Sequence, residues 1–201
     1  MNFLSIDCST EVGSLFVKVQ NKTFSKVLQS DKSSNDLLMK RILDFFIEND
    51  LKINDITQIF VNQGPGNFSS LRGSLSTAKG ISLSKNLNLS GYDTFIWACA
   101  EFINKKESIF SIIKFREEYF IKNFSKNLNV SSIFKKVSKD EIMENYDNKF
   151  KVIPKILLQN IDKNILKLSN LSIVDLDHNQ LKLLQLKGLL NENLIKPLYL
   201  G

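Results

Sequence analysis

Two short segments hold the residues best suited to chemistry. The first is Asp7-Cys8-Ser9-Thr10, at the end of a hydrophobic stretch that predicts a strand over 2–7. The second is Gly64-Pro65-Gly66, between a predicted strand over 58–62 and a predicted helix over 68–86. Carboxylate and hydroxyl groups hold metal-bound water and phosphate oxygens, while glycines before a helix start favour an anion. The candidate anion or nucleotide loop comprises Asp7, Ser9, Thr10, Gly64, Gly66 and Arg72.

The glycine loop departs from the common phosphate-binding loops. A Walker loop needs Lys and Ser or Thr after its last glycine, whereas Asn67-Phe68-Ser69 follows Gly66. Pro65 removes one N–H donor, and Arg72 opposes the helix dipole unless an anion or an acidic partner compensates it. The loop is therefore either a structural turn or a contact to a ligand or partner. For Asp7–Thr10, a turn capped by its own side chains is favoured over a phosphate-binding turn.

The predicted helix over 68–86 has two unlike faces. Leu71, Leu75 and Ala78 share one face, since successive residues are about 100° apart on a helix. The opposite face carries small residues: Ser69, Gly73, Ser76, Thr77, Gly80 and Ser84. A glycine inside a helix costs roughly 1 kcal/mol relative to Ala, so this smooth face indicates close approach by another backbone. That backbone belongs either to the chain's own sheet or to a second chain.

A second helix, predicted over 34–49 with Ser33 or Ser34 as its N-cap, is too hydrophobic for one core. Its apolar residues spread over about 200°, against roughly 100° for a helix that covers one core. The excess apolar residues are Met39, Leu43, Phe46 and Ile47. We expect the two helices to form a surface for a partner chain, or for a second copy that completes a four-helix bundle. The alternative is that a second lobe of the same chain covers this surface.

Composition limits the class of protein. The 201 residues are 43% hydrophobic, enough for a core in one domain or two small lobes, and no run approaches a membrane span. The first residues lack the basic segment of a signal peptide, so we expect a cytoplasmic protein. Cys8 and Cys99 are expected to pack as inert thiols, and His178 to lie exposed at a helix start, so neither a metal site nor a cofactor is expected.

Positive charge is concentrated in the second half of the chain. Residues 1–95 carry 10 basic and 9 acidic side chains, whereas residues 96–201 carry 17 and 12. A basic second lobe favours proximity to nucleic-acid phosphates. No RNA-binding motif is present, so a solvated surface is the default and specific RNA recognition is not expected.

The remaining elements follow from periodicity and turn residues, and no internal repeat is evident. Strands are predicted over 2–7, 13–20, 22–29, 58–62, 89–93, 108–115, 119–124, 130–134 and 149–154. Helices are predicted over 34–49, 68–86, 94–104, 138–146 and 177–190, with Ser138 facing Glu141 in a capping box. These elements predict an N-terminal lobe over 1–95 and a smaller C-terminal lobe over 96–201.

Three motifs resemble the TsaB (YeaZ) family, the small subunit of the bacterial tRNA threonylcarbamoyladenosine synthase. Gly64 to Gly73 followed by Ala78-Lys79-Gly80 resembles the family signature, Leu4 to Glu11 its opening, and Pro197-Leu198-Tyr199-Leu200 its closing P-x-Y-L. The resemblance implies an α/β protein of ribonuclease H-like (actin-like ATPase) fold with a Gcp-like domain and a reduced second lobe. Departures are Ser70, where the family has Gly, and Ser34-Asn35, where it has His.

Two functions remain in competition. The resemblance implies a non-catalytic scaffold that binds and activates a TsaD-type subunit, with a TsaE-type ATPase as a further partner and tRNA contacted only indirectly. A homodimer through the same helices is a related expectation. The alternative is a nucleotide-binding kinase or ATPase of the actin-like class that uses Asp7, Thr10 and the glycine loop.

Overall fold

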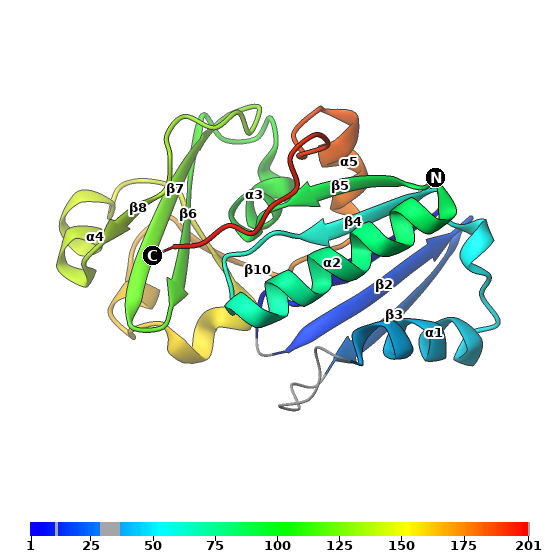
Figure 1. The fold of residues 1–201 in the computed structure, drawn as a ribbon. Coiled ribbons are helices and arrows are strands. Elements are labelled where there is room, and N and C mark those ends of the chain that lie inside the picture. The colour runs from blue at the N-terminus through cyan, green and yellow to red at the C-terminus, as the bar shows by residue number, and fades with distance from the viewer. Residues whose placement is uncertain (11, 29–36, 201) are drawn as a thin grey trace. The chain divides into compact units, whose positions relative to one another are not determined.

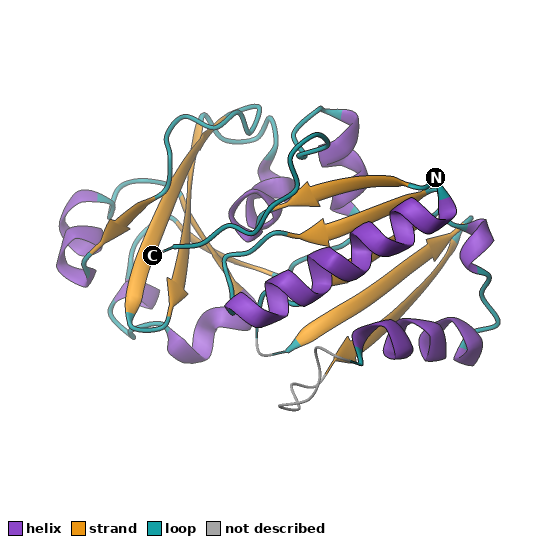
Figure 2. Cartoon of the chain, in the orientation of Figure 1, coloured by secondary structure: helices purple, strands orange, loops and turns teal. Residues whose placement is uncertain are grey.

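The computed structural model describes residues 1–10, 12–28 and 37–200, which form two compact units. Unit 1 comprises Met1–Thr94 and Leu190–Gly201, and unit 2 comprises Phe95–Leu189. Each unit is built on a five-stranded mixed sheet (Figures 1 and 2). The prediction of an α/β chain with two lobes agrees with this arrangement.

The sheet of unit 1 contains the strands β1 (Phe3–Asp7), β2 (Gly13–Val19), β3 (Lys22–Leu28), β4 (Gln58–Asn62) and β5 (Asn88–Tyr92). Their order is β3-β2-β1-β4-β5. The first three strands form the predicted antiparallel meander, and β4 and β5 are parallel to β1 and to each other. Every residue of β1 and β4 is buried, as expected for parallel strands covered on both faces.

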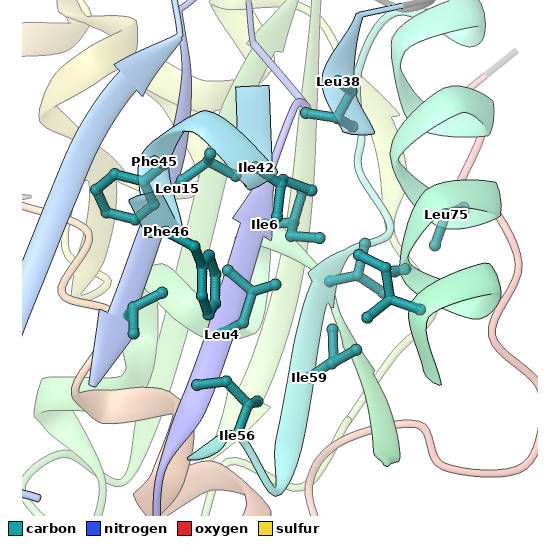
Figure 3. Packing of buried hydrophobic residues seen from close by; sticks show 14 of the residues in the cluster. Leu4, Ile6, Leu15, Leu38, Ile42, Phe45, Phe46, Ile56, Ile59 and Leu75 are labelled. Carbon is teal, nitrogen blue, oxygen red and sulfur yellow. The ribbon is translucent and has the colours of Figure 1, made fainter. Parts of the chain in front are cut away.

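Two helices, α1 (Leu38–Glu48) and α2 (Phe68–Lys85), cover one face of this sheet. Alternate strand residues, such as Leu4 and Ile6 of β1 and Ile59 of β4, point into the core between sheet and helices (Figure 3). From α1 the core receives Leu38, Ile42, Phe45 and Phe46, and from α2 it receives Leu75, Ala78 and Ile81. Each large apolar side chain buried in this way stabilises the fold by about 1.5–3 kcal/mol.

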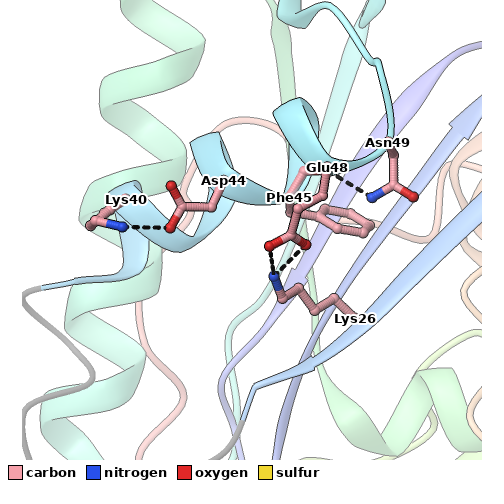
Figure 4. Close-up of polar contacts among 6 residues, drawn as sticks. All are labelled: Lys26, Lys40, Asp44, Phe45, Glu48 and Asn49. Atoms are coloured by element: carbon pink, nitrogen blue, oxygen red, sulfur yellow. Dashed lines mark hydrogen bonds and ion pairs between the residues drawn. The ribbon is translucent and has the colours of Figure 1, made fainter.

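Polar contacts add little to the attachment of α1. The Lys26 ammonium of β3 lies 2.6 Å from a Glu48 carboxylate oxygen, and Lys40 pairs with Asp44 within the helix (Figure 4). The Asn49 amide donates to the carbonyl of Phe45 at the helix end. Such half-exposed ion pairs contribute about 0–1 kcal/mol, so the buried face of α1 holds the helix in place.

The C-terminal segment 190–200 packs with unit 1, although we expected the second lobe to run to residue 201. Asn191 exchanges two backbone hydrogen bonds with Gly91 of β5, and Ile195 is buried in the core of unit 1. The Leu198 N–H donates to the Gln63 carbonyl at 2.6 Å, and the Gln63 amide donates to the carbonyl of Lys196. The burial of Ile195 and these hydrogen bonds explain why the segment packs with unit 1.

The sheet of unit 2 contains β6 (Ser108–Phe115), β7 (Glu118–Ser125), β8 (Lys135–Val137), β9 (Lys151–Pro154) and β10 (Leu171–Val174). Its helices are α3 (Thr94–Cys99), which begins at the unit boundary, α4 (Lys139–Asn145) and α5 (Gln180–Leu186). The Ser138 hydroxyl accepts the Glu141 N–H at 3.0 Å, which confirms the predicted cap of α4.

The two sheets share one topology. The order β8-β7-β6-β9-β10 in unit 2 has the same strand directions as β3-β2-β1-β4-β5 in unit 1. Between β9 and β10, however, unit 2 has only the short 3-10 helices Lys155–Asn160 and Ile165–Lys167, where unit 1 has the 18-residue α2. The second unit is therefore a reduced version of the first. The repeat is evident in the strand topology but not in the sequence.

Several predicted elements differ from the structure. The strand expected over 130–134 is displaced to Lys135–Val137, with only an isolated bridge between Val130 and Phe124, and β10 was not predicted. The helix expected over 177–190 is shorter, because it runs from Gln180 to Leu186. The expected N-cap at Ser33 or Ser34 lies outside the described residues. Within the described part of the chain, the helices are too short or too polar to cross a membrane.

Candidate functional site

The carboxyl ends of β1 and β4 bring the two predicted chemical segments together. These strands are parallel neighbours, with Ile6 opposite Val61, so Asp7 and Asn62 leave the sheet at the same edge. The Asn62 amide donates to the hydroxyl oxygens of Ser9 at 3.2 Å and Thr94 at 3.0 Å. Its carbonyl oxygen accepts the Gly64 N–H at 2.8 Å. Asn62, which the sequence did not single out, therefore links the Asp7 turn to the glycine loop.

The Asp7 carboxylate accepts hydrogen bonds within this network. Asp7 is only 4% exposed, and its Oδ1 accepts the Ser9 N–H at 2.9 Å. Burial raises the pKa of Asp7 above its ordinary value, and hydrogen bonds from Ser9 and Asn62 partly oppose that rise. The Thr10 hydroxyl donates to the Val12 carbonyl within the same turn. These contacts favour the turn capped by its own side chains over a phosphate-binding turn.

The two glycines of the loop are required by packing within unit 1. A Cβ atom on Gly66 would overlap the backbone of Ser9. Gly64 has a φ of +114°, and its Cβ atom would lie 2.9 Å from the Leu198 carbonyl oxygen. The loop thus lies directly against the Asp7 turn and the C-terminal segment, an arrangement that favours the structural-turn interpretation.

The start of α2 explains the unusual position of Arg72. The Asn67 side chain accepts the Ser69 N–H at 3.0 Å and the Ser70 N–H at 3.4 Å, and so caps the helix. The Arg72 guanidinium lies over the Phe68 ring, 5.0 Å from its centre, and Phe68 stacks on Tyr199 at 5.2 Å. The cation therefore has an aromatic partner at the helix start. The sequence signal for this contact was the closing motif that contains Tyr199.

The predicted partner surface is largely exposed, with one correction. Met39, Leu43 and Ile47 of α1 are 45%, 47% and 78% exposed. Phe46, predicted to share this surface, is 5% exposed and lies in the core against Phe45, because the turn of the helix carries it toward the sheet. On α2, Ser69, Ser76 and Gly80 are exposed, while Gly73 and Thr77 are half-buried. The α1–α2 surface, defined here as Met39, Leu43, Ile47, Ser69, Ser76 and Gly80, is the main candidate site of unit 1.

Gly80 distinguishes the two explanations for the smooth face of α2. A Cβ atom added at Gly80 would meet no atom within 4 Å. The chain's own packing therefore does not require a glycine there. The explanation that the chain's own sheet approaches closely is therefore wrong for Gly80, because the sheet contacts the opposite face of α2 through Leu75 and Ala78.

The other candidate groups are poorly suited to catalysis. Burial raises the pKa of the Cys8 thiol to about 12, and Cys99 is fully buried, so both are inert as predicted. His178 was predicted to be exposed, but its ring lies 4.7 Å from the Trp97 ring and burial lowers its pKa to about 4. Among the described residues, no three His, Cys, Asp or Glu side chains gather into a metal-binding group.

Comparisons with known proteins agree with the motifs. Residues 28–111 match the family described as TsaD, tRNA N6-adenosine threonylcarbamoyltransferase. A protein from Buchnera aphidicola subsp. Baizongia pistaciae, the tRNA threonylcarbamoyladenosine biosynthesis protein TsaB, is 31% identical over 84 residues. That match covers 42% of this chain and 38% of the Buchnera protein, so it spans less than half the length of the curated relative.

Two solved structures from Pseudomonas aeruginosa have the same fold along the chain. YeaZ superposes with a TM-score of 0.71 at 14% identity and covers 99% of both chains. An uncharacterised protein with similarity to the peptidase YEAZ gives a TM-score of 0.72 at 14% identity, over 100% of this chain and 99% of the other.

The chain thus has the α/β fold of these two structures, with two mixed sheets, and the predicted α/β class is confirmed. Over part of its length the chain is similar to the TsaD family and to a TsaB protein, in agreement with the resemblance drawn from the motifs.

Proposed function

We propose that the chain is a non-catalytic subunit in the biosynthesis of threonylcarbamoyladenosine at adenosine 37 of tRNA. In this proposal the chain binds and activates a TsaD-type catalytic subunit. The names of the related family and of the Buchnera protein support the pathway. The observation that carries the scaffold role is the exposed α1–α2 surface.

The α1–α2 surface has the composition of an interface. Met39, Leu43 and Ile47 lie at successive turns of α1 and expose apolar side chains, and α1 contacts α2, whose exposed side carries small residues. Apolar side chains that gather on one surface, beside small residues, allow close approach by another helix. If a partner covers these side chains, each contributes about 1.5–3 kcal/mol through burial. Three such residues are enough to dominate a specific contact.

The contacts of the candidate groups in the described residues support a non-catalytic role. In unit 1, Asp7 is engaged by Ser9 and Asn62, and Gly66 lies against the Ser9 backbone where a nucleotide phosphate would have to approach. In unit 2, the strand equivalent to β1 is β6, which ends at Phe115 and continues into the turn Arg116-Glu117 without a glycine or an aspartate. A phosphate-binding loop in either unit would need accessible backbone N–H donors or a free carboxylate at these positions.

Further parts of the proposal concern partners and location. We propose a TsaE-type ATPase as an additional component of the complex and the cytoplasm as its location. A homodimer through the α1–α2 surface would compete with the TsaD-type partner, because both would cover the same residues.

Mass-spectrometric measurement of threonylcarbamoyladenosine in tRNA tests the proposal. Cells that depend on this chain should lose the modified nucleoside on its depletion and regain it with the wild-type gene. Leu43→Glu combined with Ile47→Glu should not restore it, because two carboxylates would be placed in an apolar contact. Leu186→Glu, at an α5 residue that is 74% exposed, is the matched control and should restore it. Full restoration by the double variant would contradict the proposed partner surface.

Calorimetry with Mg-ATP separates this function from the alternative, a nucleotide-binding enzyme of the actin-like class. The proposed scaffold should release no saturable heat of binding when studied alone. Saturable binding that disappears in Asp7→Ala would instead establish the enzyme interpretation.

A further inference from the structure

One end of the sheet in unit 2 collects lysines from four loops. The parallel strands β6, β9 and β10 begin at this end, and the antiparallel β7 finishes there. The segments are residues 103–107, 126–129, 146–150 and 167–170, of which the last begins at the final residue of the 3-10 helix Ile165–Lys167. They carry five exposed lysines, called here the lysine rim: Lys105, Lys106, Lys126, Lys149 and Lys167. Neighbouring strands are about 4.8 Å apart, so these loops lie side by side.

Contacts between the loops fix the rim in place. The Asn104 N–H donates to the Lys126 carbonyl at 2.8 Å, and the Lys106 ammonium lies 4.6 Å from the centre of the Phe150 ring. Below them, the Lys151 side chain is fully buried. Its ammonium group lies 2.7–2.8 Å from four carbonyl oxygens, those of Tyr146, Asp147, Lys149 and Ser169.

The charge of the rim is only partly compensated. Its four loops contain two carboxylates, Glu107 and Asp147. Glu107 pairs with Lys126 at 2.6 Å, and Asp147 accepts the Ser169 N–H at 3.1 Å. Within residues 37–200, no carboxylate forms an ion pair with the other four lysines of the rim, Lys105, Lys106, Lys149 and Lys167. The rim therefore presents excess positive charge that an external anion can neutralise.

Apart from Glu107, which pairs with Lys126, the rest of the exposed surface in these loops is polar and uncharged. It consists of Asn104, Asn127, Asn129, Asn148, Ser169 and Asn170, while the hydrophobic residues of the same loops are at least partly buried. Lys, Asn and Ser are side chains that contact phosphate and sugar oxygens. Protein interfaces and membrane-binding surfaces instead expose apolar or aromatic residues. The surface therefore fits a polyphosphate backbone best.

We propose that the lysine rim binds the phosphate backbone of RNA directly and without base recognition. The choice of RNA over DNA rests on the proposed function, whereas binding to a phosphate backbone rests on the rim alone. This differs from our expectation that tRNA is contacted only indirectly. Each lysine that neutralises a phosphate releases a condensed counterion, so binding should weaken as salt rises.

Fluorescence anisotropy of a labelled, unmodified tRNA transcript with the full chain tests this proposal. The rim variant replaces three lysines by glutamate: Lys105→Glu, Lys149→Glu and Lys167→Glu. The control variant makes the same change of charge at exposed lysines elsewhere in unit 2: Lys163→Glu, Lys182→Glu and Lys187→Glu. The catalytic subunit is absent, so failure of the scaffold proposal does not affect the result.

The expected loss for the rim variant is at least tenfold in affinity, on the order of the effect of removing three phosphate contacts. Its slope of log K against log salt should be smaller by about 2–3 than that of the wild type, while the control changes affinity by less than about threefold. Equal losses in the two variants would overturn the proposal, since only total charge would then matter.

Two further measurements make the result decisive: a test of folding and a second binding partner. Circular dichroism shows whether the variants are folded, and if the glutamate variant is not, the corresponding glutamine variant replaces it with the same expected direction. Vesicles containing phosphatidylglycerol serve as the second probe. Rim-dependent binding to these vesicles without binding to tRNA would overturn the assignment to RNA.

Discussion

Gly80 offers a direct physical test of the α1–α2 surface. A side chain at this position should stabilise the isolated chain but obstruct a partner that packs closely against α2. In the isolated chain a Cβ atom at this position meets nothing within 4 Å, and the residue lies inside α2, away from both of its ends. Gly80→Ala should therefore stabilise unit 1 by about 0.8–1 kcal/mol, the difference in helix propensity between Gly and Ala. No loss from steric overlap is expected to offset this gain.

Thermal unfolding followed by circular dichroism measures the effect. A gain of about 1 kcal/mol raises Tm by roughly 2–4 °C if the chain unfolds as one body, or roughly 4–8 °C if unit 1 unfolds alone. Lys79→Ala, at an exposed neighbour in the same helix, is the control and should shift stability by less than about 0.5 kcal/mol. A fall in Tm for Gly80→Ala would refute the reasoning, because it would mean that the position is already covered within the chain.

The same position should respond differently to a longer side chain. Gly80→Gln should leave the isolated chain at least as stable as the wild type, because Gln is a better helix former than Gly and its side chain has open space. In the complex it should weaken binding of the TsaD-type partner, since the smooth face would no longer admit a close backbone. Undiminished binding by Gly80→Gln would show that the partner does not approach α2 at this point.

Three further predictions concern the turn near Asp7 and the contact between the Trp97 and His178 rings in unit 2. Gly66→Ala should lower the free energy of unfolding by about 1–3 kcal/mol in urea titrations, because its Cβ atom overlaps the Ser9 backbone; an unchanged midpoint would contradict this packing. Because the folded-state pKa of Asp7 is raised, its stabilising contribution is complete below the unfolded value and is lost as pH rises through the folded value. Asp7→Asn should therefore be more stable than the wild type near neutral pH, with the difference shrinking in acid; a constant difference would argue against a buried carboxylate. The folded-state pKa of His178 is lowered, so its contribution is present above the unfolded value of about 6.5 and is lost as pH falls toward about 4. As pH falls from about 6.5 to about 4, His178→Gln should lose less free energy of unfolding than the wild type. Urea titrations at several pH values measure this, and equal losses in both proteins would count against a neutral, half-buried imidazole.

Much of unit 1 could be predicted from the sequence because its patterns are strong and local. The strand over 58–62 has the predicted bounds, and the periodicity of Leu71, Leu75 and Ala78 identified the buried face of α2. The sequence analysis grouped the Asp7 turn and the glycine loop as one candidate loop, and the structure brings them together because both segments end parallel strands. What could not be predicted was that Gly66 contacts Ser9 so closely, because that depends on the register of β1 against β4.

The errors concern features that sequence periodicity does not determine. Phe46 and Ile47 both belong to the wide apolar arc of α1, about 100° apart on the helical wheel. Phe46 is 5% exposed and Ile47 78%, because the position of the sheet under α1 decides which part of the arc is covered. β10 is only four residues long, too short for a period of two to be distinctive. The return of segment 190–200 to unit 1 depends on distant backbone partners, such as the Gln63 carbonyl for the Leu198 N–H.

The similarity of the two sheets could not be predicted from sequence patterns, for a related reason. Strand order and direction are set by which edges pair, whereas the side chains of the two units were free to diverge. In unit 2 the strands β8, β9 and β10 have only three or four residues each, and 3-10 helices replace the long α2. A reduced lobe was predicted from the family resemblance, but its topology required the strand pairings.

Light scattering coupled to size-exclusion chromatography, on a mixture of this chain with the TsaD-type subunit from the same genome, tests the central proposal most directly. The α1–α2 surface predicts a stable complex with the wild type and with Leu186→Glu. With Leu43→Glu combined with Ile47→Glu it predicts two separate species, as loss of two buried side chains costs about 3–6 kcal/mol, on the order of a hundredfold or more in affinity. A complex of the same mass and yield with the double variant, shown by circular dichroism to be folded, would contradict the account.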